Sequence, residues 1–169
     1  MTTLATAELR RLLDTGTALS DNHFHAAAIG LLDFADLLDR TDVRAHLRVQ
    51  TVPDPTDQPV RAAFADWAAL GADTGIGPLY GGADRLLRLA LSIAHGIPVD
   101  LSGALSGLGH AHARAVLDAM AVALGVGGDV EITDTPAYLA RRRADQEAVR
   151  AILERRGLDA DDQPIRTQE

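Results

Sequence analysis

The sequence contains no cysteine and no lysine. Without cysteine the chain has no disulfides, no thiolate metal sites and no cysteine nucleophile. Without lysine it has neither a Schiff-base lysine nor the lysine of a phosphate-binding P-loop. Aromatic residues are also few, at 4% of the sequence. These absences exclude several classes of enzyme before any motif is considered.

Long apolar runs and targeting signals are missing as well. No run approaches the roughly 20 apolar residues that cross a bilayer. The first residues, Met1–Ala5, include neither a basic region nor a long apolar segment of the kind that begins a secretory signal. We therefore expect a cytoplasmic protein that makes no contact with membranes.

Basic charge is in the minority. Sixteen arginines stand against twenty-four acidic residues, which gives a net charge of -8 with histidine neutral. Proteins that bind nucleic acid normally present a basic face, because neutralising phosphates supplies much of their affinity. We expect no nucleic-acid partner, except through the C-terminal helix described below.

What the sequence does contain favours helices around one core. Hydrophobic residues make up 47% of the 169 positions, an ordinary value for a globular domain. Alanine and leucine are abundant and β-branched residues sparse, which predicts an all-α, single-domain bundle of six or seven helices. The clearest helical spacing, at i, i+3, i+4 and i+7, is that of Phe24, Ala27, Ala28, Leu31, Ala35 and Leu38.

Further segments have the pattern of core helices, and two resemble strands. Helices are predicted over 59–70, 83–95 and 110–124. Residues 47–52 and 130–133 are short β-type runs, which predict one very short two-stranded element if they pair. The residues expected in one core are Phe24, Leu31, Leu38, Phe64, Trp67, Leu87, Leu91, Val116 and Met120.

The composition changes near the C-terminus. We expect a helical core domain over 1–133, an arginine-rich helix over 134–157 and a polar tail over 158–169. Ordinary i, i+4 ion pairs on a solvated helix would explain the charges, but the thin apolar stripe of the helix is also suited to docking on the core or on a partner. The candidate partner-binding residues are Arg141, Arg142, Arg143, Arg150 and Arg155.

Two His-x-His elements are candidate metal ligands. They are His23-Phe24-His25 and His110-Ala111-His112, and imidazole is the commonest metal ligand. The first element, with Asp21, superficially resembles the Asp-x-His-x-His motif of metal-dependent amidohydrolases, in which the motif ends a barrel strand. Here a helix follows, and side chains two apart on a helix diverge by about 200°. Surface or capping histidines are the alternative interpretation.

A polar stripe interrupts the apolar helix predicted over 83–95. Arg88, Ser92 and His95 share one face with Arg85 and are candidate catalytic residues. Arg88 and His95 loosely resemble the Arg-x(4–6)-His signature of HEPN-type helical ribonucleases, although Leu89 replaces the polar residue that usually follows the arginine. The resemblance implies that His95 would transfer a proton while Arg88 held the phosphate.

The same stripe has a structural explanation. A solvated helix face would account for it, and we expect Asp118 to be the counter-ion of Arg85 or Arg88.

The leading interpretation is an interaction or accessory protein that acts through a helical surface. We expect its partner to be another protein or a second copy of the chain, and we expect no cofactor. The alternatives are a HEPN-like ribonuclease using Arg88 and His95, and a metal-dependent hydrolase using the His-x-His pairs. An enzyme is therefore not the leading interpretation.

Overall fold

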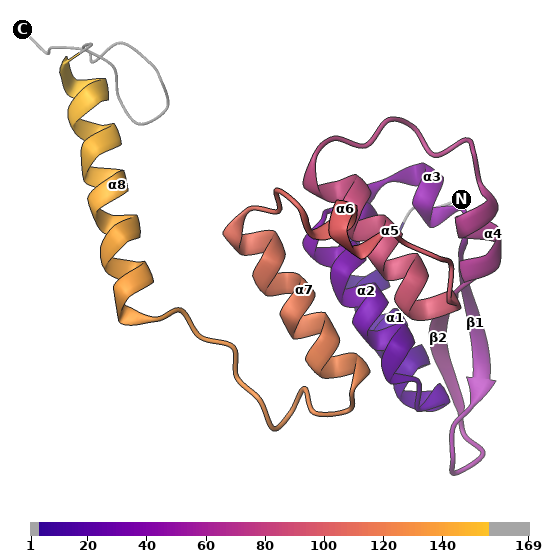
Figure 1. Ribbon diagram of the computed structural model, residues 1–169. Helices are drawn as coiled ribbons and strands as arrows, with labels where there is room; N and C mark the ends of the chain where they lie inside the picture. The colour runs from indigo at the N-terminus through magenta and orange to yellow at the C-terminus, as the bar shows by residue number, and fades with distance from the viewer. Residues whose placement is uncertain (1–3, 156–169) are drawn as a thin grey trace, which may run out of the picture. The chain divides into compact units, whose positions relative to one another are not determined.

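The computed structural model describes residues 4–155. The chain divides into two compact units, and the boundary along the chain falls between Ile132 and Thr133. Within the described residues it is mostly helical, with one small antiparallel sheet. The elements, labelled in Figure 1, are α1 (Thr6–Ser20), α2 (His23–Phe34), the 3-10 helix η1 (Leu37–Asp39), α3 (Thr41–Arg44), β1 (Leu47–Pro53), β2 (Pro59–Ala65), α4 (Trp67–Ala72), α5 (Gly82–His95), α6 (Leu101–Leu105), α7 (His110–Ala123) and α8 (Pro136–Arg155).

Helix α2 is the centre of the first unit. The side chain of Asn22 accepts a hydrogen bond from the backbone N–H of His25 at 3.0 Å, which caps the helix start. One side of α2 packs against α5 and α7, and α1 also contacts it (Figure 1). Its buried residues are Ala27, Ala28, Ile29, Leu31 and Leu32. The apolar spacing seen in the sequence therefore corresponds to a helix with neighbours on several sides.

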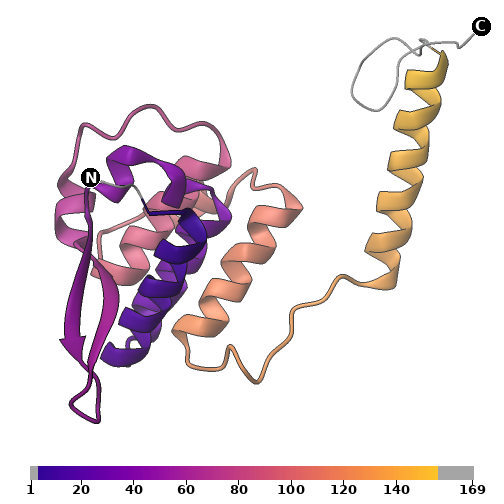
Figure 2. The same cartoon turned by 180° about the vertical axis from the view of Figure 1, so that it is seen from behind.

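Helix α1 lies directly on strand β2 (Figure 2). The contact is close because Gly16 of α1 has no side chain. A Cβ atom built on Gly16 would lie 2.1 Å from the carbonyl oxygen of Ala63 in β2. The helix and the strand thus approach backbone to backbone at this point, and Ala62 and Ala63 are buried there.

The hairpin of β1 and β2 corrects the prediction of a helix over 59–70 for residues 59–65, whereas 67–70 are helical in α4. The strands pair antiparallel from Leu47 opposite Ala65 to Pro53 opposite Pro59. Their connection is closed by Asp54, whose carboxylate accepts hydrogen bonds from the backbone N–H groups of Thr56 and Gln58 at 2.8 and 2.9 Å. Such local bonds favour a turn over a helix.

The predicted partner strand, residues 130–133, is not a strand in the structure. Residues 47–52 do lie in β1, but they pair with the segment that immediately follows them in the chain. The local turn at Asp54 supplies a partner at much lower loop-closure cost than a segment almost eighty residues away.

Most of the residues expected in the core are buried. Leu31 and Leu38 are fully buried, and the other buried ones are Trp67, Leu87, Leu91 and Val116. The prediction is wrong for Phe24 and Met120, whose exposed fractions are 56% and 45%, and Phe64 is only half-buried. Phe24 and Met120 line the same surface feature, described in the next section.

Asp42 attaches the long connection between α4 and α5, residues 73–81, to the rest of the first unit. Its carboxylate accepts hydrogen bonds from the Arg40 guanidinium at 2.6 Å and from the backbone N–H of Gly77 at 3.0 Å. The Arg40 bond is the main cause that holds the pKa of Asp42 well below its ordinary value, and the Gly77 and Val43 N–H groups add to it. The connection is therefore fastened at its middle by a charged group.

The second unit contains α8. The hydroxyl of Thr135 accepts a hydrogen bond from the backbone N–H of Tyr138 at 3.2 Å, at the helix start. No residue of α8 between Pro136 and Arg155 is buried. Within residues 4–155, no helix combines the length and the apolar character needed to cross a bilayer.

Candidate functional site

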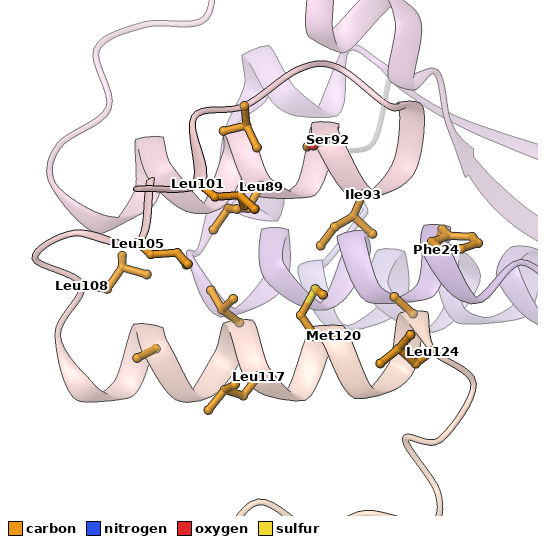
Figure 3. Close-up of a pocket in the computed structure, with 14 residues that line it drawn as sticks. Phe24, Leu89, Ser92, Ile93, Leu101, Leu105, Leu108, Leu117, Met120 and Leu124 are labelled. Carbon is orange, nitrogen blue, oxygen red and sulfur yellow. The ribbon is translucent and has the colours of Figure 1, made fainter. Parts of the chain in front are cut away.

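An apolar groove of about 670 Å³ lies between α5, α6 and α7 (Figure 3). Ser92 is the one polar side chain among the described residues that line it. Ile93 of α5 and Met120 of α7 point toward each other across it (Figure 3). We call this feature the apolar groove, and it is the largest cavity by volume of those that we describe.

The walls of the apolar groove follow from helical spacing. On α5, Leu89, Ser92 and Ile93 are separated by three and four residues, so they share a face. On α7 the corresponding residues include Val116 and Met120, one turn apart. Two neighbouring helices thus each turn an apolar face toward the space between them.

Short helix α6 closes one end of the apolar groove. The carboxylate of Asp100 accepts a hydrogen bond from the backbone N–H of Ser102 at 3.0 Å, which caps α6. Leu101 and Leu105 of α6 gather at this end, whereas Phe24 and Leu124 lie at the opposite end (Figure 3). The two ends of the apolar groove are therefore chemically similar.

The lining of the apolar groove is unusually exposed for side chains of its kind. The exposed fractions of its large side chains are 58% for Leu101, 53% for Leu117, 72% for Leu124 and 56% for Phe24. Single exposed apolar residues are common on proteins, but a contiguous group marks a binding surface or an aggregation liability. This group gives the domain a surface that water solvates poorly.

Arg85 lies beside the α6 end of the apolar groove. It is one helical turn before Leu89, and its guanidinium is next to Gly107, where a Cβ would lie 3.2 Å from Nη1. The residue is half-buried, yet no carboxylate of residues 4–155 lies within 4.0 Å of it. The other half-buried arginines of the described chain each have a carboxylate within that distance, and they are Arg10, Arg40, Arg44 and Arg114.

The three candidate catalytic residues do not share a site. Arg88 is exposed and pairs with Asp84, one turn earlier on α5, at 3.0 Å. Ser92 lines the apolar groove, whereas His95 lines a different pocket. The structure therefore does not bring an arginine, a serine and a histidine together at this stripe.

The expected counter-ion is also different. Asp118 lies within 3.9 Å of Arg114, one turn earlier on α7, and not near Arg85 or Arg88. The predicted pairing of Asp118 with Arg85 or Arg88 is wrong, because each of Asp118 and Arg88 has a partner at i, i+4 spacing on its own helix.

His95 lies with His25 in a shallow pocket of about 470 Å³. Burial lowers the pKa of His25, the Ala94 carbonyl partly offsets this, and the neighbouring His95 lowers the pKa further. The ring of His25 lies 5.7 Å from that of Trp67. Arg48, which also lines the pocket, is paired with Asp66 at 3.0 Å, so the cation is already neutralised.

The histidines proposed as metal ligands lie in different surroundings. The ring of His112 packs edge-on against Phe34 at 5.5 Å, and His23 lies near Gly125. His25 is in the pocket just described, and His110 begins α7. In the part of the chain that the structure describes, no three His, Asp or Glu side chains are arranged to hold a metal ion.

The candidate partner-binding arginines all lie on α8 and are exposed: Arg141, Arg142, Arg143, Arg150 and Arg155. Exposed apolar side chains accompany them, namely Leu139, Val149 and Ile152. The helix has the composition that the sequence predicted for a contact surface, and its binding role stays a prediction.

Sequence reasoning missed the apolar groove. The segment 83–95 is apolar on most sides, and such a helix is usually surrounded by neighbours. The signal that was available is the number of large apolar residues on and just after α6 and α7, since Leu101, Leu105, Leu117 and Leu124 exceed what one buried side of each helix needs.

Comparison with known protein families, with curated proteins and with solved structures gave no match in any of the three.

Proposed function

We propose that this protein is an interaction module that binds an amphipathic helix of another protein in the apolar groove. The observation that carries the proposal is the exposure of large apolar side chains along the α7 side and at both ends of one groove, with Leu117 and Met120 on α7, Leu101 on α6 and Phe24 at the opposite end. Binding a helix would remove this surface from water, at roughly 25 cal/mol for each Å² of apolar area.

The shape of the groove favours a helix over an extended peptide. An extended peptide binds by adding to a sheet edge through main-chain hydrogen bonds. The groove has no such edge, because helices α5, α6 and α7 form it. A helix binds such a surface through apolar side chains at i, i+3, i+4 and i+7. Its backbone needs no hydrogen bonds from the groove.

The test uses the full chain and a displayed library of helical peptides of about four turns, with randomised faces. Peptides are selected on the wild-type protein and then tested against Met120→Asp, which places a carboxylate inside the apolar groove. Val130→Asp is the matched control, because Val130 is also exposed but does not line the groove. Circular dichroism checks that each variant is folded.

We expect selected peptides with an apolar stripe that bind the wild type and Val130→Asp equally and Met120→Asp at least about tenfold more weakly, since a carboxylate is costly to desolvate in an apolar site. The proposal is wrong if no peptides are enriched, or if those enriched bind Met120→Asp as well as the wild type. Self-association lost in Met120→Asp alone would assign the groove to a second copy instead.

A further inference from the structure

Arg85 is the feature of the apolar groove that the proposed function leaves unused. It is a half-buried cation next to Gly107, and Gly107 lies between Leu105 and Leu108, both of which line the groove. Among residues 4–155 no carboxylate lies within 4.0 Å of it. Its neighbour on the same helix, Arg88, is more exposed and already paired with Asp84.

The guanidinium of Arg85 has no ion pair within the described residues, although water still reaches it. Partial burial removes some of its water, and five N–H donors need acceptors. The remaining half-buried arginines of the described chain each have a carboxylate within 4.0 Å, at 2.7 Å in the pair of Arg10 and Asp33. The one acidic side chain of α5, that of Asp84, is already paired with Arg88, so a carboxylate of a bound partner can pair with Arg85 without displacing that ion pair.

We infer that the helix bound in the apolar groove carries an aspartate or glutamate at one end of its apolar stripe, and that this carboxylate pairs with Arg85. The inference rests on the proposed function and adds the chemistry and direction of the partner. The apolar walls bind either direction of a stripe about equally, since leucines lie at both ends. A single cation at the α6 end distinguishes the two directions.

The overall charge of the protein limits the number of acidic residues in the partner. The net charge of -8 repels a strongly acidic helix at long range. A helix with one carboxylate beside the stripe and a neutral or basic outer face can pair with Arg85 and is not repelled by the net negative charge. Charge complementarity at Arg85 is local, whereas the repulsion is spread over the whole surface and is screened beyond about 8 Å at physiological salt.

The test continues the peptide selection on the full chain. One selected peptide with a terminal acidic residue is made in two forms, with Glu and with Gln at that position, and each is titrated by fluorescence anisotropy. The proteins are the wild type, Arg85→Gln and, as a matched control on the same helix, Arg88→Gln. Dodecanoate is titrated separately, because a fatty acid also joins an apolar chain to one carboxylate.

We expect acidic residues to be enriched at one end of the selected stripes. The wild type and Arg88→Gln should bind the Glu form about five- to tenfold more tightly than the Gln form, an effect between that of an exposed ion pair and that of a buried hydrogen bond to a charged group. Arg85→Gln should bind both forms equally. The change in the peptide leaves the protein unaltered, so this comparison does not depend on how Arg85→Gln folds.

The inference is wrong, with the proposed function intact, if helices bind in the groove without an acidic preference or if the preference persists in Arg85→Gln. If no helix binds but dodecanoate binds in an Arg85-dependent manner, the occupant is a fatty acid and both proposals fail. If neither binds, the proposed function itself fails.

Discussion

Two glycine-to-alanine substitutions in neighbouring helices should change stability in opposite directions. Gly16 of α1 faces the backbone of β2, and a Cβ there would lie 2.1 Å from the Ala63 oxygen. Gly30 of α2 has open space, with no atom within 4 Å of a built Cβ. The two changes add the same methyl group to helix interiors and differ only in what that group meets.

The magnitude follows from two opposing terms. Replacing glycine by alanine inside a helix stabilises it by about 1 kcal/mol, because glycine loses more backbone entropy on folding. At Gly16 the new carbon must move about 1.3 Å away from a backbone oxygen to reach an ordinary contact distance of 3.4 Å. Overpacking of this kind costs about 1–3 kcal/mol, and backbone on both sides of the contact favours the upper value.

We therefore expect Gly16→Ala to lower the free energy of unfolding by about 2 kcal/mol and Gly30→Ala to raise it by about 1 kcal/mol. Urea titration followed by circular dichroism at the helix band measures both. The corresponding shifts in Tm are about 4–8 °C downward and about 2–4 °C upward. A Gly16→Ala protein as stable as the wild type would refute the close approach of α1 to β2.

Three further outcomes are expected. Leu31→Ala, at a fully buried position of α2, should lower the free energy of unfolding by about 2–5 kcal/mol, measured by urea titration. A loss below about 1 kcal/mol would argue against the position of α2 at the centre of the first unit. Asp42→Asn should lower the free energy of unfolding by about 1 kcal/mol at pH 7. The pKa of Asp42 is lowered in the folded state, so the difference should shrink as the pH falls below about 4, where the carboxyl of the unfolded chain binds a proton that the folded state does not. A pH-independent difference would contradict the ion pair with Arg40. A chain ending at residue 135 should keep a cooperative urea transition, because α8 has no buried residue; its unfolding would place α8 in the core.

The helices that sequence predicted well are those with local signals at both ends. Helix α5 begins after a glycine-rich segment and ends at Gly96, which adopts a left-handed φ of 69°. Helix α7 begins after Gly109 and ends before Gly125, which adopts a φ of 75°. Capping and glycine termination act within a few residues, so they can be read from the sequence without knowledge of the fold.

The hairpin could not be predicted in the same way. Alanine in 59–65 favours a helix by intrinsic propensity, and Pro59 suits a first helical position. In the structure the same alanines pair with β1 and lie under α1, where their small size permits the close approach at Gly16. Tertiary contacts outweigh a propensity of a few tenths of a kcal/mol per residue.

The polar stripe of α5 was predictable from helical spacing, whereas its surroundings were not. Helical spacing identifies Arg88 and His95 as neighbours on one face of α5, yet each turns to a different environment. Whether a polar side chain meets a partner on its own helix or on another depends on the positions of the other helices. The exposure of Phe24 and Met120 has the same origin, since their spacing is that of core residues.

The contact between α1 and β2 also constrains how the domain can deform. Rotating α1 by one residue, about 100°, would bring Thr15 toward the Ala63 oxygen, and sliding it by one turn, about 5.4 Å, would bring Ser20 there. Both have a Cβ, which the space at Gly16 does not admit. A displacement of α1 along or about its axis therefore has to carry β2 with it.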